Sequence, residues 1–221
     1  MTTQEMLSHV DHTLLQATAT WPQIEALCRE AIEYRTASVC IPPCYIRRVR
    51  ETFGSAVTIC TVIGFPLGYS VTAAKVTEAR EAIRDGADEI DMVINISDIK
   101  NGDYDKAEAE IAAVREACQG CVLKVIVETC YLTEEEKVAA CGIVTRAGAD
   151  YIKTSTGFGT AGATREDIAL FREHNGPAVA IKAAGGIRSI ADMQAFLELG
   201  AERLGTSSAI QLIRGEESKG Y

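Results

Sequence analysis

The sequence predicts one (β/α)8 barrel, the TIM-barrel architecture, formed by residues 1–221 as a single domain. Three observations lead to this prediction. Strand and helix patterns alternate from end to end, they make eight units of similar length, and no linker, low-complexity tract or charge block divides the chain. Such barrels typically have about 250 residues, so this one would be short. The alternative is a doubly wound open sheet, but no G-x-G-x-x-G follows the first strand, and eight evenly spaced units favour closure.

Short apolar or alternating runs predict the strands, and apolar residues at helical spacing predict the helices between them. The expected strands are 9–13, 37–41, 57–63, 89–95, 121–128, 150–155, 178–184 and 203–206. The expected helices are 21–34, 43–53, 70–85, 103–117, 134–146, 164–174, 189–199 and 207–214. Thr20 with Pro22 marks the start of the first helix, and Thr133 with Glu136 has the form of a capping box.

A weak internal repeat supports the regular spacing of these units. Three helix ends read DGADEI (85–90), AGADYI (147–152) and LGAERL (199–204). Each places a glycine where a left-handed helix cap is expected, then an acid, then a strand. Two βα units fit between successive copies, as a barrel requires.

Composition limits the function classes. Apolar residues make up 47% of the chain, enough for a full core, and the formal net charge is −9. That charge argues against nucleic acid or an anionic membrane as a partner, because phosphate backbones demand clustered Lys and Arg. No apolar stretch reaches the roughly 18–20 residues of a membrane span. The first residues lack the pattern of a signal peptide, so we expect a cytoplasmic protein.

The cysteines and histidines do not predict a metal site. Eight cysteines in a chain without a secretion signal are expected to be free thiols. Cys118 and Cys121 form one C-x-x-C pair with no second pair at zinc-site spacing. The three histidines fall in no H-x-H or H-E-x-x-H motif. We therefore expect neither a metal nor a cofactor.

Two lysines stand alone in apolar, strand-like runs. Lys153 lies in DYIKTSTGFGT (150–160) and Lys182 in PAVAIKAAGGIR (177–188). Burying an unpaired ammonium is so costly that the group usually loses its proton instead. A desolvated lysine beside a second cation becomes a nucleophilic amine that can form a Schiff base with a carbonyl. The two runs thus indicate covalent chemistry on an aldehyde or ketone.

The alternation of strand residues places more polar groups beside these lysines. If Lys153 and Lys182 point into the barrel, Asp91 and Lys124 point inward from two other strands, and apolar neighbours face the helices. Neighbouring strands lie about 4.8 Å apart, so the two lysines are expected to be close, with Asp91 offsetting charge and handling protons. One such lysine would more simply be an ion-pair partner, which remains the simpler interpretation of Lys124. Two lysines and an aspartate on one face favour a site.

Small-residue loops follow the last strands, where barrel enzymes often bind phosphate. AGGIRS (184–189) follows strand seven, and GTSSAI (205–210) follows strand eight. Glycines permit close backbone approach, Arg188 supplies a charge, and a helix that starts near Ser207 favours an anion. TSTGFG (154–159), which contains Thr156, is a third such loop. Together with the lysines, these loops predict an enzyme acting on a phosphorylated aldehyde or ketone.

These segments together resemble the deoxyribose-phosphate aldolase family of class I aldolases. The resemblance runs through nearly the whole chain: DHTLL (11–15), SVCIPP (38–43), VIGFPLG (62–68), EIDMVINI (89–96), LKVIVET (123–129), YIKTSTGF (151–158), IKAAGGIR (181–188) and RLGTSS (203–208). It implies a (β/α)8 barrel, in agreement with the independent prediction. It also implies reversible cleavage of 2-deoxy-D-ribose 5-phosphate to acetaldehyde and D-glyceraldehyde 3-phosphate, in deoxyribonucleotide and deoxynucleoside catabolism.

The resemblance assigns roles to individual residues. Lys153 would be the Schiff-base lysine, Lys182 the second lysine whose charge favours the free amine of Lys153, and Asp91 the acid of a proton relay. The phosphate would be bound by Gly157, Gly185, Gly186, Arg188, Gly205, Ser207 and Ser208. Some members carry a lysine directly after the glycine of the KTSTG motif, whereas this chain has Phe158. One positive contact to phosphate is therefore expected to be missing.

Further expectations concern supporting residues and assembly. Lys124, Thr156 and Tyr221 are candidate supporting residues. Residues 215–221 are expected to form a flexible tail, and the resemblance suggests that Tyr221 reaches the barrel mouth and helps to protonate an intermediate. The family implies a homodimer or homotetramer.

Two other functions remain open. One is a phosphate-binding barrel isomerase, or a Schiff-base aldolase for another sugar. The other is a non-catalytic sugar-phosphate sensor, which the retained lysines and Asp91 oppose, because a binder has no use for a reactive amine.

Overall fold

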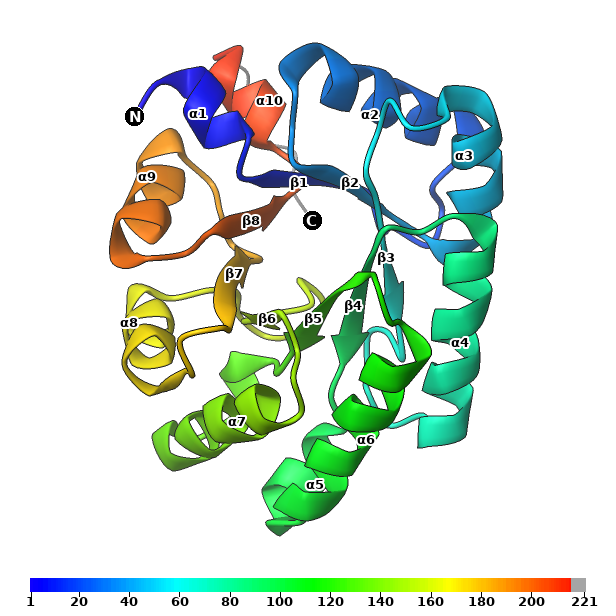
Figure 1. Ribbon diagram of the computed structural model, residues 1–221. Helices are drawn as coiled ribbons and strands as arrows, with labels where there is room; N and C mark the ends of the chain where they lie inside the picture. The colour runs from blue at the N-terminus through cyan, green and yellow to red at the C-terminus, as the bar shows by residue number, and fades with distance from the viewer. Residues whose placement is uncertain (216–221) are drawn as a thin grey trace.

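The computed structural model describes residues 1–215, which form a closed barrel of eight parallel strands paired in sequence order (Figure 1). The ring closes where β1 pairs with β8, with Val10 opposite Leu204. The predicted (β/α)8 barrel is thus confirmed over the open sheet. The predicted tail lies outside the described residues except for Gly215, and so does Tyr221.

The observed elements follow the predicted order with shorter strands. The strands are β1 Val10–Thr13, β2 Ser38–Ile41, β3 Ile59–Ile63, β4 Glu89–Val93, β5 Val122–Ile126, β6 Tyr151–Lys153, β7 Ala180–Ala184 and β8 Arg203–Thr206. The helices are α1 Thr3–Leu7, α2 Trp21–Tyr34, α3 Ile46–Phe53, α4 Thr72–Asp85, α5 Ile96–Asn101, α6 Tyr104–Ala117, α7 Glu134–Arg146, α8 Arg165–His174, α9 Ile190–Leu199 and α10 Ala209–Ile213. Short 3-10 turns occupy Pro43–Tyr45 and Thr129–Tyr131.

Local signals in the sequence set several helix ends as predicted. Thr20 is the N-cap of α2, and Thr133 and Glu136 form the capping box of α7, with each side chain bonded to the other's backbone N–H. The repeat glycines Gly86 and Gly200 cap α4 and α9 in the left-handed conformation, at φ 109° and 110°. The helices α1 and α5 were not predicted, because five or six residues are too few to show a helical period.

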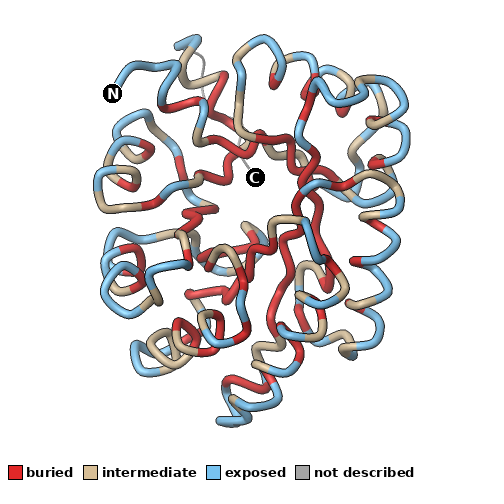
Figure 2. The backbone as a smooth tube through the Cα atoms, viewed as in Figure 1, coloured by how far each residue is buried: buried red, intermediate tan, exposed pale blue. Residues whose placement is uncertain are grey.

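The main hydrophobic core lies between the strands and the helices, whereas the interior of the barrel contains charged residues. Ile90, Met92, Leu123 and Val125 face the helices and are completely buried, as the alternation predicted. Figure 2 shows this buried ring of strands enclosed by helices with exposed outer faces. Each such side chain contributes about 1.5–3 kcal/mol by leaving water. The helix-facing core therefore stabilises the barrel and leaves its interior free for polar residues.

The eight cysteines all carry free thiols. Among residues 1–215, no helix combines the length and the apolar character needed to cross a membrane.

Candidate active site

A cluster of charged side chains fills the barrel interior beneath the carboxyl ends of the strands. The strand register places Lys153 opposite Lys182 and Asp91 opposite Lys124. The cluster consists of Asp11, Glu89, Asp91, Lys124, Lys153, Lys182 and Arg203, contributed by β1, β4, β5, β6, β7 and β8. Its members come from distant parts of the chain and meet because the ring is closed.

Asp91 is the centre of this cluster. Its Oδ2 accepts from the Nζ of Lys153 at 2.8 Å and from the Nζ of Lys182 at 2.6 Å. Its Oδ1 accepts from the Nζ of Lys124 at 2.9 Å. Because both lysines contact the same oxygen, their nitrogens are neighbours, as predicted. Lys124 is thus part of the cluster and the ion-pair partner of Asp91.

The charges of these groups reinforce one another. Burial opposes ionisation of Asp91, but the ammonium groups of Lys124, Lys153 and Lys182 outweigh it and hold the pKa of that carboxyl well below its usual range. Burial likewise opposes the charge of Lys182, but Asp11 and Asp91 outweigh it and raise the pKa of its amine. Lys182 therefore remains a cation beside Lys153.

A second tier closes the cluster toward the amino ends of the strands. The Nη1 of Arg203 donates to Asp11 at 2.6 Å, and both of its terminal nitrogens contact Glu89. Lys182 also donates to Asp11, and Lys124 donates to Glu89 at 2.6 Å. Asp11, Glu89 and Arg203 were not predicted to be site residues. The inward alternation of strands one, four and eight is the signal that could have found them.

Counting formal charges shows how balanced the cluster is. Three carboxylates face three cations other than Lys153. Apart from Lys153, the interior therefore carries no net formal charge. A buried set of ion pairs is favourable only when its members satisfy one another.

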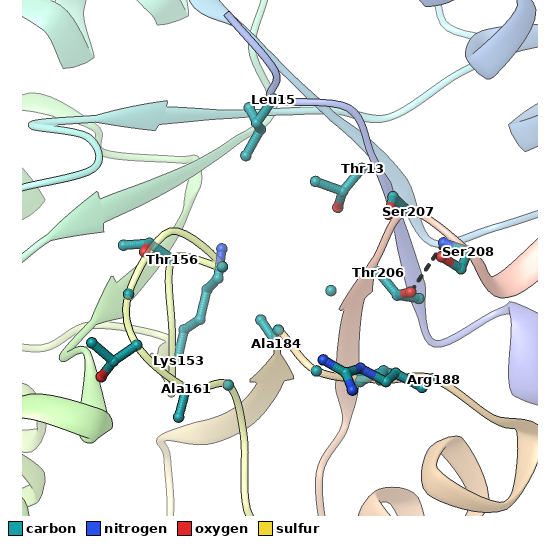
Figure 3. A pocket seen from close by; sticks show the side chains of 18 residues that line it. Thr13, Leu15, Lys153, Thr156, Ala161, Ala184, Arg188, Thr206, Ser207 and Ser208 are labelled. Carbon is teal, nitrogen blue, oxygen red and sulfur yellow. Dashed lines mark hydrogen bonds between the residues drawn. The ribbon is translucent and has the colours of Figure 1, made fainter. Parts of the chain in front are cut away.

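A cavity of about 510 Å³ opens above the cluster at the barrel mouth. Lys153 lines this cavity although its exposed fraction is only 3%, whereas Asp91 and Lys182 are completely buried. In Figure 3 the Lys153 amine points into the cavity, and Arg188, Ser207 and Ser208 lie on the opposite side. Lys153 is therefore the member of the cluster that a molecule in the cavity would meet.

The cavity is lined by every residue proposed for phosphate binding. These are Gly157, Gly185, Gly186, Arg188, Gly205, Ser207 and Ser208, and Thr156 also lines it. Thr13 at the end of β1 and Leu15 in the loop after it contribute as well, although sequence reasoning did not name them. Four segments far apart in the chain thus line one cavity.

Gly205 has a structural role that sequence reasoning did not anticipate. A Cβ at this position would lie 2.9 Å from the Cβ of Ala184 and 3.1 Å from the Cε of Lys182. Such contacts are too short, so any larger residue would displace the Lys182 stem. Gly205 thus leaves room for the second lysine as well as lining the cavity.

Phe158, which replaces the lysine seen in some family members, packs against another aromatic ring. Its ring lies edge-on to Phe65, with centroids 5.3 Å apart and planes at 87°. Edge-to-face pairs of this kind are favourable by about 0.5–1.5 kcal/mol. The residue after the KTSTG glycine therefore serves packing at the mouth.

Two groups of side chains have atoms close enough to hold a metal ion. They are Cys40, Cys60 and Asp91, and Asp11, Cys60 and Glu89. The carboxylates in both groups already accept from lysine or arginine, and the Cys60 thiol lies 3.3 Å from the Nζ of Lys124. Cys60 packs in a small apolar cluster with Leu15, Cys40 and Val62, and its thiol also contacts Asp91 and Lys124.

Comparison with known proteins defines the class of this barrel. The family model of the DeoC/LacD family aldolases matches residues 5–210. The chain therefore belongs to this family, and the resemblance seen in the sequence is confirmed.

Individual relatives agree over their full length. The chain is 61% identical over 221 residues to a deoxyribose-phosphate aldolase of Clostridium botulinum (strain Alaska E43 / Type E3), covering 100% of both proteins. It is 57% identical over 218 residues to the enzyme of that name from Clostridioides difficile (strain 630), covering 99% of this chain and 100% of the relative. Among solved structures, the tetrameric deoxyribose phosphate aldolase of Aeropyrum pernix matches with a TM-score of 0.90 at 32% identity, covering 97% of this chain and 92% of that one.

Proposed function

We propose that this protein is a class I aldolase that reversibly cleaves 2-deoxy-D-ribose 5-phosphate into acetaldehyde and D-glyceraldehyde 3-phosphate. The observation that supports this most is the position of Lys153. Its amine opens into the cavity while sharing one oxygen of Asp91 with the cationic Lys182. An amine that a substrate carbonyl can reach from the cavity suits Schiff-base chemistry.

The carbon–carbon bond breaks after the sugar is bound covalently. The unprotonated Lys153 amine attacks the C1 aldehyde of the open-chain sugar, and loss of water gives an iminium. The C2–C3 bond then breaks, and its electron pair moves toward the iminium nitrogen to give an enamine. Loss of the C3 hydroxyl proton turns C3 into the aldehyde of glyceraldehyde 3-phosphate. Protonation of the enamine at C2 and addition of water release acetaldehyde and restore the amine.

Asp91 and Lys182 handle the protons of this sequence. Asp91 relays the C3 hydroxyl proton through a water molecule, since its carboxylate already contacts both amines. The lowered pKa of Asp91 disfavours keeping this proton, so the proton passes on to C2 of the enamine, and the step balances. Lys182 keeps its positive charge directly beside the Lys153 amine. Lys124 completes the relay by fixing the other oxygen of Asp91.

The phosphate binds at the opposite wall of the cavity. Arg188 provides the positive charge, Ser207 and Ser208 provide hydroxyl groups, and the glycines of the three loops allow close backbone contact. This anchor orients C1 of the sugar toward Lys153 and so lowers the entropic cost of reaction. Thr156 also lines the cavity.

The proposal extends to assembly and to the cellular setting. A homodimer or homotetramer is proposed because the Aeropyrum pernix relative is tetrameric, and analytical ultracentrifugation tests it. A cytoplasmic catabolic role without a nucleic-acid partner fits the net charge of −9.

Two measurements test the proposed function. A coupled assay should detect glyceraldehyde 3-phosphate released from 2-deoxyribose 5-phosphate. Borohydride reduction in the presence of acetaldehyde, followed by peptide mass mapping, should find an adduct on Lys153. Product without an adduct would point to another mechanism, and an adduct without product would point to an aldolase for another sugar. Binding of the sugar phosphate with neither result would leave a sensor.

A further inference from the structure

Glu128 is a buried carboxyl group beside the cavity that the mechanism above does not use. It follows β5, and its exposed fraction is 2%. Both of its carboxylate oxygens accept from the backbone N–H of Thr156, at 3.2 and 3.3 Å. Its Oε2 also accepts from the hydroxyl of Thr156 in a short hydrogen bond. The partner of Glu128 is therefore a residue that lines the cavity.

The backbone of Glu128 is held in an unfavourable conformation. Its φ is 54° and its ψ 66°, the left-handed region that costs a residue with a Cβ about 1–2 kcal/mol. Among residues 1–215 only Arg35 is a second non-glycine case, and Arg35 is an ordinary left-handed cap at the end of α2. At Glu128 the conformation falls at the carboxyl end of a strand, where barrel enzymes place functional residues.

The hydrogen bonds continue from Glu128 along the loop after Lys153. The Oγ1 of Thr156 accepts from the backbone N–H of Phe158 at 3.0 Å. A Cβ at Gly159 would lie 3.1 Å from the Cδ of Glu128, so the loop packs directly on the carboxyl group. Glu128 thus contacts the loop at both ends, on either side of the cavity-lining Gly157.

The electrostatic position of Glu128 fits a group that orders this loop. Burial raises the pKa of its carboxyl, while the hydrogen bonds from Thr156 and the charge of Lys153 oppose that rise. The hydrogen bonds from Thr156 therefore stabilise the ionised form of Glu128. A carboxylate matches these donors because its oxygens only accept hydrogen bonds.

We propose that Glu128 is a positioning residue that holds the loop 154–159 in the shape that receives the phosphate-bearing end of the substrate. This inference rests on the function proposed above and deepens it. Glu128 does not touch the cavity itself, and it acts through Thr156 and Gly157. Its effect should therefore depend on whether the sugar carries a phosphate.

The test compares phosphorylated and unphosphorylated 2-deoxyribose as substrates of Glu128→Gln. Glutamine keeps the size of the side chain but replaces one acceptor by an NH2 donor facing the Thr156 donors. We expect kcat/KM for 2-deoxyribose 5-phosphate to fall about tenfold, mainly through KM, as one lost hydrogen bond to a charged group would give. The value for 2-deoxyribose should change less than about twofold, since a contact that only the phosphorylated sugar makes cannot alter it. Glu134→Gln, at an exposed position in the first turn of α7, is the matched control and should change neither value.

A second measurement separates positioning from misfolding. Acetaldehyde and borohydride should label Lys153 in Glu128→Gln as fast as in the wild type, because acetaldehyde carries no phosphate. If Glu128→Gln does not fold, Thr156→Val removes the same hydroxyl bond from the other side and should give the same phosphate-specific loss. Equal losses for both sugars, or no loss for either, would overturn the inference while leaving the aldolase function intact. A wild-type protein that cleaves neither sugar would overturn both.

Discussion

Two sites in this barrel contain buried lysines, and they differ in the partners that the amines contact. Lys75, on α4, is completely buried between α4, α6 and the end of β4. Its Nζ donates to Glu110 at 2.7 Å and to the carbonyl oxygen of Val93 at 2.8 Å. At the interior site, by contrast, three lysines share the single carboxylate of Asp91.

The difference shows that burial of a lysine does not by itself indicate function. Lys75 has one carboxylate of its own and a backbone carbonyl, so its donors are satisfied locally. Lys153 shares its carboxylate oxygen with Lys182 and also borders a cavity. A shared acceptor and access to a cavity are thus the two features that distinguish Lys153 from Lys75. The pKa of Lys75 is lowered by burial, with Glu110 only partly offsetting it, whereas the carboxylates around Lys182 raise its pKa.

The strongest test of this comparison removes the nucleophile. Lys153→Leu should reduce turnover of 2-deoxyribose 5-phosphate by about 10³-fold or more and abolish the borohydride adduct, because no other amine of the cluster lines the cavity among the described residues. The melting temperature should show that the fold survives, since Asp91 still accepts hydrogen bonds from Lys124 and Lys182. Measurable turnover near the wild-type rate would contradict the assignment.

Removing the shared carboxylate should affect both chemistry and stability. Asp91→Asn leaves the ammonium groups of Lys124 and Lys182 against a neutral amide, so the unfolding free energy should drop by about 3–5 kcal/mol. The kcat value should fall by roughly 10²–10⁴-fold as the proton relay is lost. Urea denaturation and steady-state kinetics measure the two effects. A stable and active variant would show that Asp91 is not the centre of the cluster.

Variants of the Lys75–Glu110 ion pair should lose stability but keep their activity. Lys75→Met leaves Glu110 buried without its partner and should cost about 3 kcal/mol of unfolding free energy. The double variant Lys75→Met/Glu110→Gln should recover part of that loss, because no uncompensated charge remains. The kcat/KM value of every folded variant should stay within about twofold of the wild type. A tenfold loss would mean that the two lysine sites are coupled.

The smallest expected effect concerns stability at alkaline pH, where Lys75 and the lysines of the interior should contribute in opposite directions. Because the folded-state pKa of Lys75 lies below the 10.5 of the unfolded chain, its contribution to stability rises with pH between those two values. The raised pKa values of Lys124 and Lys182 give contributions that are complete below 10.5 and are lost only as pH rises through the folded values.

The pH test compares the wild type with Lys75→Met. Urea denaturation from pH 8 to 10 should show a less positive slope in the variant, by below about 1 kcal/mol over the range. Identical slopes would mean that burial does not disfavour the charge of Lys75. Lys75→Arg is the control, since arginine keeps its charge throughout this range.

Local patterns in the sequence predicted most of the fold and half of the site. The alternation of strand residues placed Asp91, Lys124, Lys153 and Lys182 inside the barrel, and the glycines after the strands indicated the loops that line the cavity. The same rule could have placed Asp11 and Arg203, but a polar residue near a strand end is usually exposed. Lys75 offered no signal at all, because lysine is common on the outer face of a helix.

The amino-acid sequence by itself determined the alternating units, the helix caps and the inward direction of the key side chains, because these depend on neighbours a few residues away. Only the tertiary structure decided which charges meet. Asp11 from the first strand contacts Lys182 from the seventh because closing the ring brings residues 171 positions apart within hydrogen-bonding distance. Likewise, Glu128 adopts its unfavourable backbone where the loop after β6 supplies the donors that hold it. Contacts that depend on closure of the barrel and on strand register leave no local pattern in the sequence, so they could not be predicted from it.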